Sequence, residues 1–262
     1  MEQTTAHIGW LARHERGVIA AALITVAALA WAYLVAGAGM DMGAADTMAM
    51  PGMDHAAWSA STFLVVFVMW AVMMAAMMLP SAAPMILLYA AVSRRLAAPP
   101  ARAATGAFAL GYLTLWTAFS LGAAALQLLL QQLALLSHEM HATSAALGGT
   151  ILAAAGVYQL TPLKQACLRQ CRSPLELITS YWRSGTAGAF QMGLAHGLYC
   201  VGCCWMLMAL LFVGGVMNLV WIAVIALAVM AEKLAPAGHW LARAAGVALI
   251  AWGGVVLWRA LA

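Results

Sequence analysis

The feature that most constrains this chain is a succession of apolar runs, each about 20 residues long, which together occupy nearly all of it. Inside a bilayer the backbone N–H and C=O groups must be bonded within their own segment, so such runs form helices. Only 8% of the residues are charged and the mean hydropathy is +0.93, values that exclude an ordinary soluble globular protein. The sequence therefore predicts an all-α membrane protein, a polytopic bundle of about seven transmembrane helices.

The predicted spans leave no room for a separate soluble domain, so we expect a single integral membrane domain over residues 1–262. The spans lie near residues 17–37, 59–79, 105–132, 144–161, 186–213, 216–233 and 241–261. Met85–Val92 follows Pro80 and Pro84, and we interpret it as an extension of the second span past a kink. The first run ends on small residues that resemble a signal-peptide cleavage site, but its length predicts an uncleaved anchor.

The positive charges between the spans predict the orientation, since short cytoplasmic loops retain Lys and Arg. The residues assigned in this way to the cytoplasmic side are Arg13, Arg16, Arg94, Arg95, Arg102, Lys164, Arg169, Arg172, Arg183 and Lys233. The alternate segments contain Asp41, Asp46, Asp54 and Glu139, and only Arg259 ends up outside. We therefore expect the N-terminus inside and the C-terminus outside, in a multi-pass inner (plasma) membrane protein. The net charge of +4 follows from this topology and gives no ground for nucleic-acid binding.

The fifth predicted span carries an unusual set of metal-binding side chains in the stretch QMGLAHGLYCVGCCWMLMAL, residues 191–210. At about 100° per residue, Met192, His196, Cys200 and Cys203 fall within roughly 80° of one another, and Cys204 lies about 40° further round. Thiolate, thioether and imidazole ligands together favour Cu(I), while zinc or an iron–sulfur centre fits so much methionine poorly. Taken singly, each residue is explained as a small apolar side chain or a histidine bonded to a neighbouring helix. Taken together, they indicate a copper site.

The exterior segment 39–58 is rich in methionine, which is an uncommon residue in loops. Thioethers stay neutral over a wide pH range and resist the oxidation that exposed thiols suffer outside the cytoplasm, so this segment resembles a collector of Cu(I). The predicted ligands are Met48, Met50, Met53 and His55, with Met40 and Met42 beside them. The alternative is a flexible apolar loop that touches the membrane surface. The next exterior segment adds His138 and His141, which are equally compatible with a solvated loop or a ligand cluster.

Two further groups are candidate ligands near the central stripe. Met73 and Met77 of the second span should lie at the depth of His196 and the cysteines if the second and fifth spans pack antiparallel, although methionine-rich helices are most often simply packed. Met74 and Met78 occupy a neighbouring face. Cys167 and Cys171, four residues apart in the predicted cytoplasmic segment 162–185, are either palmitoylated, inert, or a relay that passes metal to or from the membrane site.

Several blocks of the sequence resemble a family of predicted metal-binding integral membrane proteins that includes copper chaperones for a bacterial tyrosinase-type polyphenol oxidase. The blocks are MAAMMLPSAAPM at 74–85, YQLTPLKQACLRQCRSPL at 158–175, MGLAHGLYCVGCCWMLMALLFVGGVMNLVW at 192–221 and AEKLAPAG at 231–238. The resemblance implies copper binding and delivery. Carried onto this sequence, it assigns the copper to His196, Cys200, Cys203 and Cys204, with Cys167 and Cys171 as accessories.

The leading hypothesis is a protein that holds Cu(I) among its helices and passes it to an extracytoplasmic copper enzyme. The direction of transfer and the oligomeric state are not encoded in these motifs. The main alternative is an enzyme, a membrane thiol–disulfide oxidoreductase using Cys200 and Cys203, although the exterior segments contain no cysteine to act as its partner pair. A third hypothesis is a haem protein with axial ligands among His138, His141 and His196.

Patterns of other enzyme classes are missing, since the chain has no phosphate-binding glycine loop and no HExxH helix. Two expectations about packing remain. Glu232 and Lys233 are expected to form a structural ion pair at the cytoplasmic end of the sixth span. Gly106, Gly111 and Gly122 are expected to allow close helix contacts in the third span.

Overall fold

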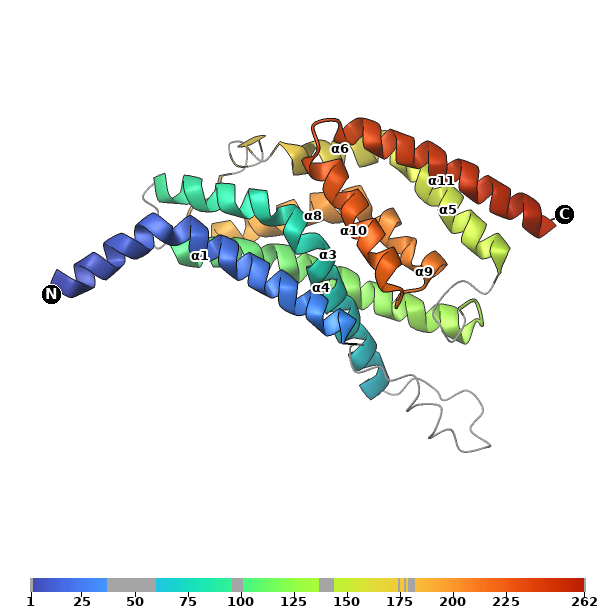
Figure 1. The fold of residues 1–262 in the computed structure, drawn as a ribbon, viewed down its shortest axis with the longest axis horizontal. Helices are drawn as coiled ribbons and strands as arrows, with labels where there is room; N and C mark the ends of the chain where they lie inside the picture. The colour runs from blue at the N-terminus through green and yellow to red at the C-terminus, as the bar shows by residue number, and fades with distance from the viewer. Residues whose placement is uncertain are drawn as a thin grey trace.

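The computed structural model describes residues 2–36, 60–95, 101–136, 144–173, 175–176, 178 and 182–261, and within these ranges the secondary structure is helical. The helices are α1 (Glu2–Val35), α3 (Ala60–Arg95), α4 (Ala101–Gln132), α5 (Ala145–Leu160), α6 (Pro162–Arg172), α8 (Gly185–Ala209), α9 (Leu211–Gly214), α10 (Leu219–Leu234) and α11 (Gly238–Leu261). Figure 1 shows an elongated bundle in which α1 and α11 lie on opposite sides, with α8 between them.

Five helical segments in the described ranges are long and apolar enough to cross a membrane: Gly17–Val35, Ala60–Arg95, Ala103–Gln132, Gly185–Gly214 and Gly238–Leu261. The pair α5 and α6 adds a sixth if the two form one bent span. Helix α10 corresponds to most of the predicted run 216–233 but has only 16 residues, so the count of seven spans stays a prediction. The expected extension of the second span is confirmed, because α3 continues without a break through Pro80 and Pro84 to Arg95.

A proline inside α3 creates one of the contacts that join α1 to the bundle. Pro80 has no N–H, so the carbonyl of Ala76 loses its partner four residues along the helix. The indole N–H of Trp31 on α1 donates to this carbonyl at 3.2 Å. The exposed carbonyl that the proline creates is therefore used to attach a neighbouring helix.

The sharp bend between α5 and α6 is encoded at Thr161 and Pro162. Thr161 has φ −70° and ψ 149°, the extended conformation favoured before a proline. Its N–H donates to the Tyr158 carbonyl at the end of α5, and its hydroxyl accepts from the Lys164 N–H at the start of α6. One residue thus caps both helices, which are bent by 64°, and α6 turns back to pack against α8.

Glycines permit the closest helix crossings. A Cβ at Gly111 of α4 would collide with the Phe190 carbonyl of α8, and a Cβ at Gly193 of α8 would collide with the Phe108 carbonyl of α4. The prediction for Gly111 is therefore confirmed. It is wrong for Gly106 and Gly122, where an added Cβ would meet nothing within 4 Å, because these residues face away from the α8 crossing. The pair α5 and α11, which run side by side in Figure 1, use glycines in the same way.

Candidate metal centre

Helix α8 buries the metal-binding residues that the sequence singles out. Cys200, Cys203 and Cys204 are each at most 1% exposed, and His196 and Met192 are 4% and 2% exposed. All five lie on the buried side of α8, in agreement with the predicted stripe. The three thiols are therefore shielded from solvent near the centre of the bundle, where soft donors meet little competition from water.

Helix α10 places a lysine against these thiols. The Lys233 Nζ donates to the Sγ of Cys200 at 2.9 Å and to the hydroxyl of Ser81 on α3 at 3.1 Å. Lys233 is buried, so its ammonium group requires both hydrogen-bond acceptors and a compensating negative charge. Of the two described groups that accept hydrogen bonds from Lys233, the Cys200 sulfur is the one that can carry a negative charge.

The expected ion pair between Glu232 and Lys233 is wrong. The Glu232 carboxylate instead bonds Lys164 of α6 at 2.6 Å and Gln159 of α5 at 2.6 Å. Adjacent residues in a helix point about 100° apart, so Glu232 and Lys233 face different neighbours. The carboxylate therefore neutralises Lys164 and leaves the charge of Lys233 to the cysteines.

Helices α3 and α4 complete the surroundings of Cys200 and Cys204. The Tyr112 hydroxyl lies 3.1 Å from the Cys200 Sγ and 3.1 Å from the Met78 carbonyl, to which it donates. The Met78 Sδ lies 3.9 Å from the Cys204 Sγ. Met73 and Met77 are also buried and stay predicted ligands, while the described sulfur contact to a cysteine is that of Met78, on the neighbouring face. Helix α3 packs mainly on α4, α1 and α10, so it meets α8 through side chains and not through a long backbone interface.

Helix α6 brings both of its cysteines to α8. The Cys171 Sγ lies 3.9 Å from the Cys203 Sγ. Cys167 packs on Gly202, where an added Cβ would lie 2.8 Å from the cysteine sulfur. A cavity of about 430 Å³, lined by residues of α6 and by Tyr199 of α8, reaches Cys167, which is only half-buried. We call Cys167, Cys171, Cys200, Cys203, Cys204 and Met78 the sulfur cluster.

The cysteines of the sulfur cluster are free thiols, and two of them form hydrogen bonds to the backbone. The Cys203 and Cys204 thiols both donate to the Cys200 carbonyl, at 3.1 and 2.9 Å. In the described ranges, no group of three His, Cys, Asp or Glu side chains has the geometry to bind one metal ion without rearrangement. Rotation of the Cys203 and Cys204 side chains away from the carbonyl would release their sulfur atoms, so the cluster supplies suitable donors that must reorient to bind a soft cation.

His196 lies one turn before Cys200 and has an unused polar atom. Its ring stacks with Tyr112, at 5.5 Å between centroids, and with Phe108, at 6.1 Å. Its Nδ1 is buried without a hydrogen-bond partner among the described residues, which is an unfavourable state for a ring nitrogen. The Met192 sulfur accepts the Arg183 N–H at 3.4 Å and thus lies at the start of α8.

Sequence reasoning missed Tyr112, Ser81 and the role of Lys233. An aromatic or a serine inside an apolar run carries no visible signal, but a lysine at the end of a run does, because an ionisable group in a membrane segment is a candidate functional residue. The predicted exterior ligands Met48, Met50, Met53 and His55 lie outside the described residues, as do His138 and His141.

The fold and this site define the class: a helical protein whose described residues include five helices suited to a membrane, or six with the bent pair α5 and α6, and a buried cluster of thiols. More narrowly, the chain belongs to the PpoB2 copper chaperone family, whose match covers residues 67–256. The resemblance inferred from the sequence is thus confirmed. The matched range includes the whole sulfur cluster and Lys233, whereas α1 and the methionine-rich segment 39–58 precede it. Comparison with curated proteins gave no match, and comparison with solved structures gave none.

Proposed function

We propose that this chain is an integral membrane copper chaperone that binds Cu(I) in the sulfur cluster and delivers it to an extracytoplasmic copper enzyme. The observation that carries the proposal is the convergence of thiols from α8 and α6 and a thioether from α3 in one buried place. Soft thiolate and thioether ligands suit Cu(I), and the thioether makes zinc or an iron–sulfur centre a poorer match. The copper is cargo, and membership of a copper chaperone family supports a role in which the protein transfers copper and does not catalyse a reaction.

Lys233 suits a Cu(I) site in particular. Cu(I) bound by two thiolates carries one net negative charge, which is costly inside an apolar bundle. The ammonium group of Lys233 already bonds Cys200 at 2.9 Å and would balance that charge. The Glu232 carboxylate balances the charge of Lys164. The charge of Lys233 is therefore left to balance the proposed metal site.

The arrangement also provides a route for cargo. Cys167 borders the cavity of about 430 Å³, and Cys171 on the same helix lies 3.9 Å from the buried Cys203. Ligand exchange between neighbouring sulfurs would carry Cu(I) from Cys167 or Cys171 to Cys203, Cys200 and Cys204. His196 is a further ligand in this scheme. Met73, Met77 and Met192, together with the exterior ligands Met48, Met50, Met53 and His55, are proposed as weaker sites.

The proposed topology has the N-terminus inside, the C-terminus outside and seven crossings of a plasma membrane. In its support, successive long elements in Figure 1 alternate in direction: α1, α4, α8 and α11 run one way, and α3, α5 and α10 run the other. In that arrangement α6 lies towards the cytoplasmic side and the segment 39–58 towards the exterior. Cargo would then move from the cytoplasmic cysteines to the exterior methionines.

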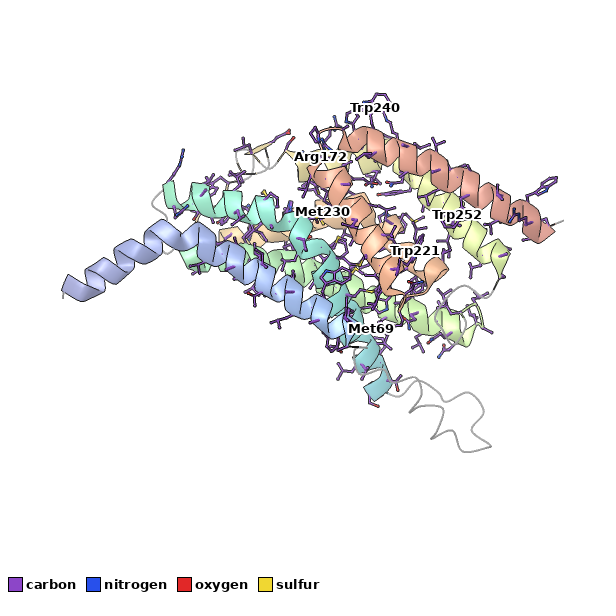
Figure 2. The ribbon with its side chains drawn as sticks, viewed as in Figure 1. Met69, Arg172, Trp221, Met230, Trp240 and Trp252 are labelled. Atoms are coloured by element: carbon purple, nitrogen blue, oxygen red, sulfur yellow. The ribbon has the colours of Figure 1, made fainter. Side chains whose placement is uncertain are left out.

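The test is a Cu(I) competition between the detergent-purified full-length protein and a chromogenic chelator under reducing conditions. The wild type is expected to retain copper against the chelator, and Cys200→Ser with Cys203→Ser is expected to lose it. Met230→Leu serves as the matched control, because Met230 lies on α10 outside the sulfur cluster (Figure 2). Failure of the wild type to bind copper, or unchanged binding by the double variant, would contradict the proposal.

A thiol–disulfide oxidoreductase remains the second candidate, with a different cysteine pair from the one that the sequence indicates. The sulfur of Cys203 on α8 lies 3.9 Å from that of Cys171 on α6. Towards Cys200, the bond of the Cys203 thiol goes to the backbone carbonyl. Such an enzyme would form a Cys171–Cys203 disulfide and pass two electrons to an acceptor such as a quinone. Quinone-dependent loss of thiols in the wild type, absent in Cys171→Ser, would favour this function over copper handling.

A further inference from the structure

A second cavity, on the other side of α6 from Cys167, has a different chemistry from the sulfur cluster. It has a volume of about 610 Å³, within the range of small-molecule sites. Its wall combines positively charged and apolar side chains from the end of α5, from α6 and from the start of α11. The lining residues are Leu160, Pro162, Gln165, Leu168, Arg169, Arg172, His239 and Arg243.

Two of the charged side chains of this basic cavity, those of Arg172 and Arg243, are held in place before any ligand arrives. The Arg172 guanidinium donates to the carbonyls of Glu232 and Pro236 at 2.8 and 2.7 Å. A Cβ at position 238 would collide with the same guanidinium, so Gly238 is what lets Arg172 reach them. Arg243 lies over the ring of Trp240, at 5.2 Å from its centroid. Fixed guanidinium groups lose little conformational entropy when they bind an anion.

Among the described residues that line the cavity none is acidic, so they do not cancel its positive charge. The carboxylate of Glu232 is engaged by Lys164 and Gln159, and the bond from Arg172 to Glu232 goes to the backbone carbonyl. Guanidinium groups bind phosphate oxygens in bidentate geometry, which makes phosphate the best-matched anion. The wall therefore has at least two arginines available to a phosphate group.

The remaining surface of the cavity indicates what is attached to the phosphate. Leu160, Pro162 and Leu168 form an apolar part of the wall. Trp240, next to the cavity residue His239, is 61% exposed, as is common for tryptophans at the lipid headgroup level. Figure 2 shows Arg172 and Trp240 at the same end of the bundle, where α10 gives way to α11. A molecule with a phosphate and an apolar tail fits both parts of the wall.

We propose that the basic cavity binds the phosphate group of an amphipathic anion, with an anionic phospholipid of the surrounding membrane as its source. The proposal uses the membrane location argued above but none of the cysteines, so it stands or falls separately from copper binding. Basic cavities between helices at the cytoplasmic side of membrane proteins are suited to anionic head groups. Binding there would tie α6, which carries Cys167 and Cys171, to the start of α11.

The experiment measures lipid binding to the full-length protein in neutral detergent by native mass spectrometry. The probes are a short-chain phosphatidylglycerol, a phosphatidylcholine with the same acyl chains, and glycerol phosphate without chains. We expect the phosphatidylglycerol to bind about tenfold more tightly than the phosphatidylcholine. Glycerol phosphate that binds as tightly as the lipid would support the anion site but assign it to a soluble phosphate ester. Equal binding of the two lipids would overturn the proposal.

The variants test whether the cavity is responsible. Arg169→Gln with Arg243→Gln should weaken phosphatidylglycerol binding about 10- to 100-fold, since each removes a charged donor to the phosphate. Arg172 is left unchanged because it holds the α10–α11 connection. Arg259→Gln, at the far end of α11, is the matched control and should bind lipid as the wild type does. Copper retention is measured on the same samples, and wild-type lipid binding by the double variant would refute the site.

Discussion

The Nζ of Lys233 donates a hydrogen bond of 2.9 Å to the Sγ of Cys200, and so connects α10 directly to the cysteines of α8. Both side chains are buried, and Ser81 is the other acceptor of the ammonium group. Hydrogen bonds to charged groups are about twice as strong as those between neutral groups, and their geometry is correspondingly well defined. Lys233 therefore holds the Cys200 sulfur in position, as the proposed copper site requires.

Removal of the lysine charge should weaken copper binding. Lys233→Met leaves a copper–dithiolate centre without its counter-charge, and loss of one partner of a buried charged pair typically costs about 3 kcal/mol or more, or about 100-fold in affinity. Chelator competition measures the change. Lys233→Arg, which keeps the charge, should lose much less than Lys233→Gln, which keeps only hydrogen-bonding capacity. Equal losses for arginine and glutamine would show that charge is not what matters.

The helices were predictable from the sequence to the extent that the length of an apolar run determines them. The second run, with its extension past Pro84, became α3, and the run around His196 became α8. The bend at Thr161 was not foreseen, although a threonine before a proline is a strong signal for a cap. Residues 162–172, expected within a cytoplasmic segment, form helix α6 and pack against α8.

The candidate site was predictable along α8 but not across the bundle. Periodicity places residues on a face of their own helix, whereas the rotation of that helix relative to its neighbours depends on packing. Met78, whose sulfur lies 3.9 Å from the Cys204 sulfur, follows Met77 directly, and adjacent helix positions point about 100° apart, a difference that periodicity alone does not orient towards α8. Glu232 and Lys233 are also about 100° apart on α10, so only one of the two side chains, that of Lys233, contacts the described cysteines.

The pair Lys164–Glu232 should contribute to stability in a way that only a double variant reveals. Both side chains are at most 4% exposed and their charged atoms are 2.6 Å apart. Glu232→Gln alone would leave Lys164 buried without a counter-charge, and we expect a loss of about 3 kcal/mol. Combining it with Lys164→Met should recover most of that loss. Thermal unfolding in detergent measures both, and additive effects of the two changes would contradict the coupling.

The α4–α8 crossing should not tolerate a methyl group. Gly193→Ala places a Cβ against the Phe108 carbonyl, which belongs to the backbone and cannot rotate away, so α4 and α8 must separate. We expect a loss of about 1–3 kcal/mol, as for other overpacked positions. Gly106→Ala is the control on α4, because it meets nothing within 4 Å and replaces glycine by a better helix former. A similar unfolding temperature for the two variants would show that the crossing is looser than described.

The cysteines should differ in their reactivity, and copper should protect them. Cys167 is half-buried beside a cavity of about 430 Å³, whereas the three thiols of α8 are at most 1% exposed. Without metal, N-ethylmaleimide should therefore modify Cys167 first, and mass spectrometry of peptides would identify the site.

Prior addition of Cu(I) should slow modification of Cys171 and Cys203 about tenfold or more, since a bound thiolate is no longer a free nucleophile. Silver(I) should protect equally, because it is a soft monovalent cation, while Mg²⁺, which prefers oxygen ligands, should not. Protection by Mg²⁺ would point to a change in accessibility instead of ligation and would remove this support for the copper site.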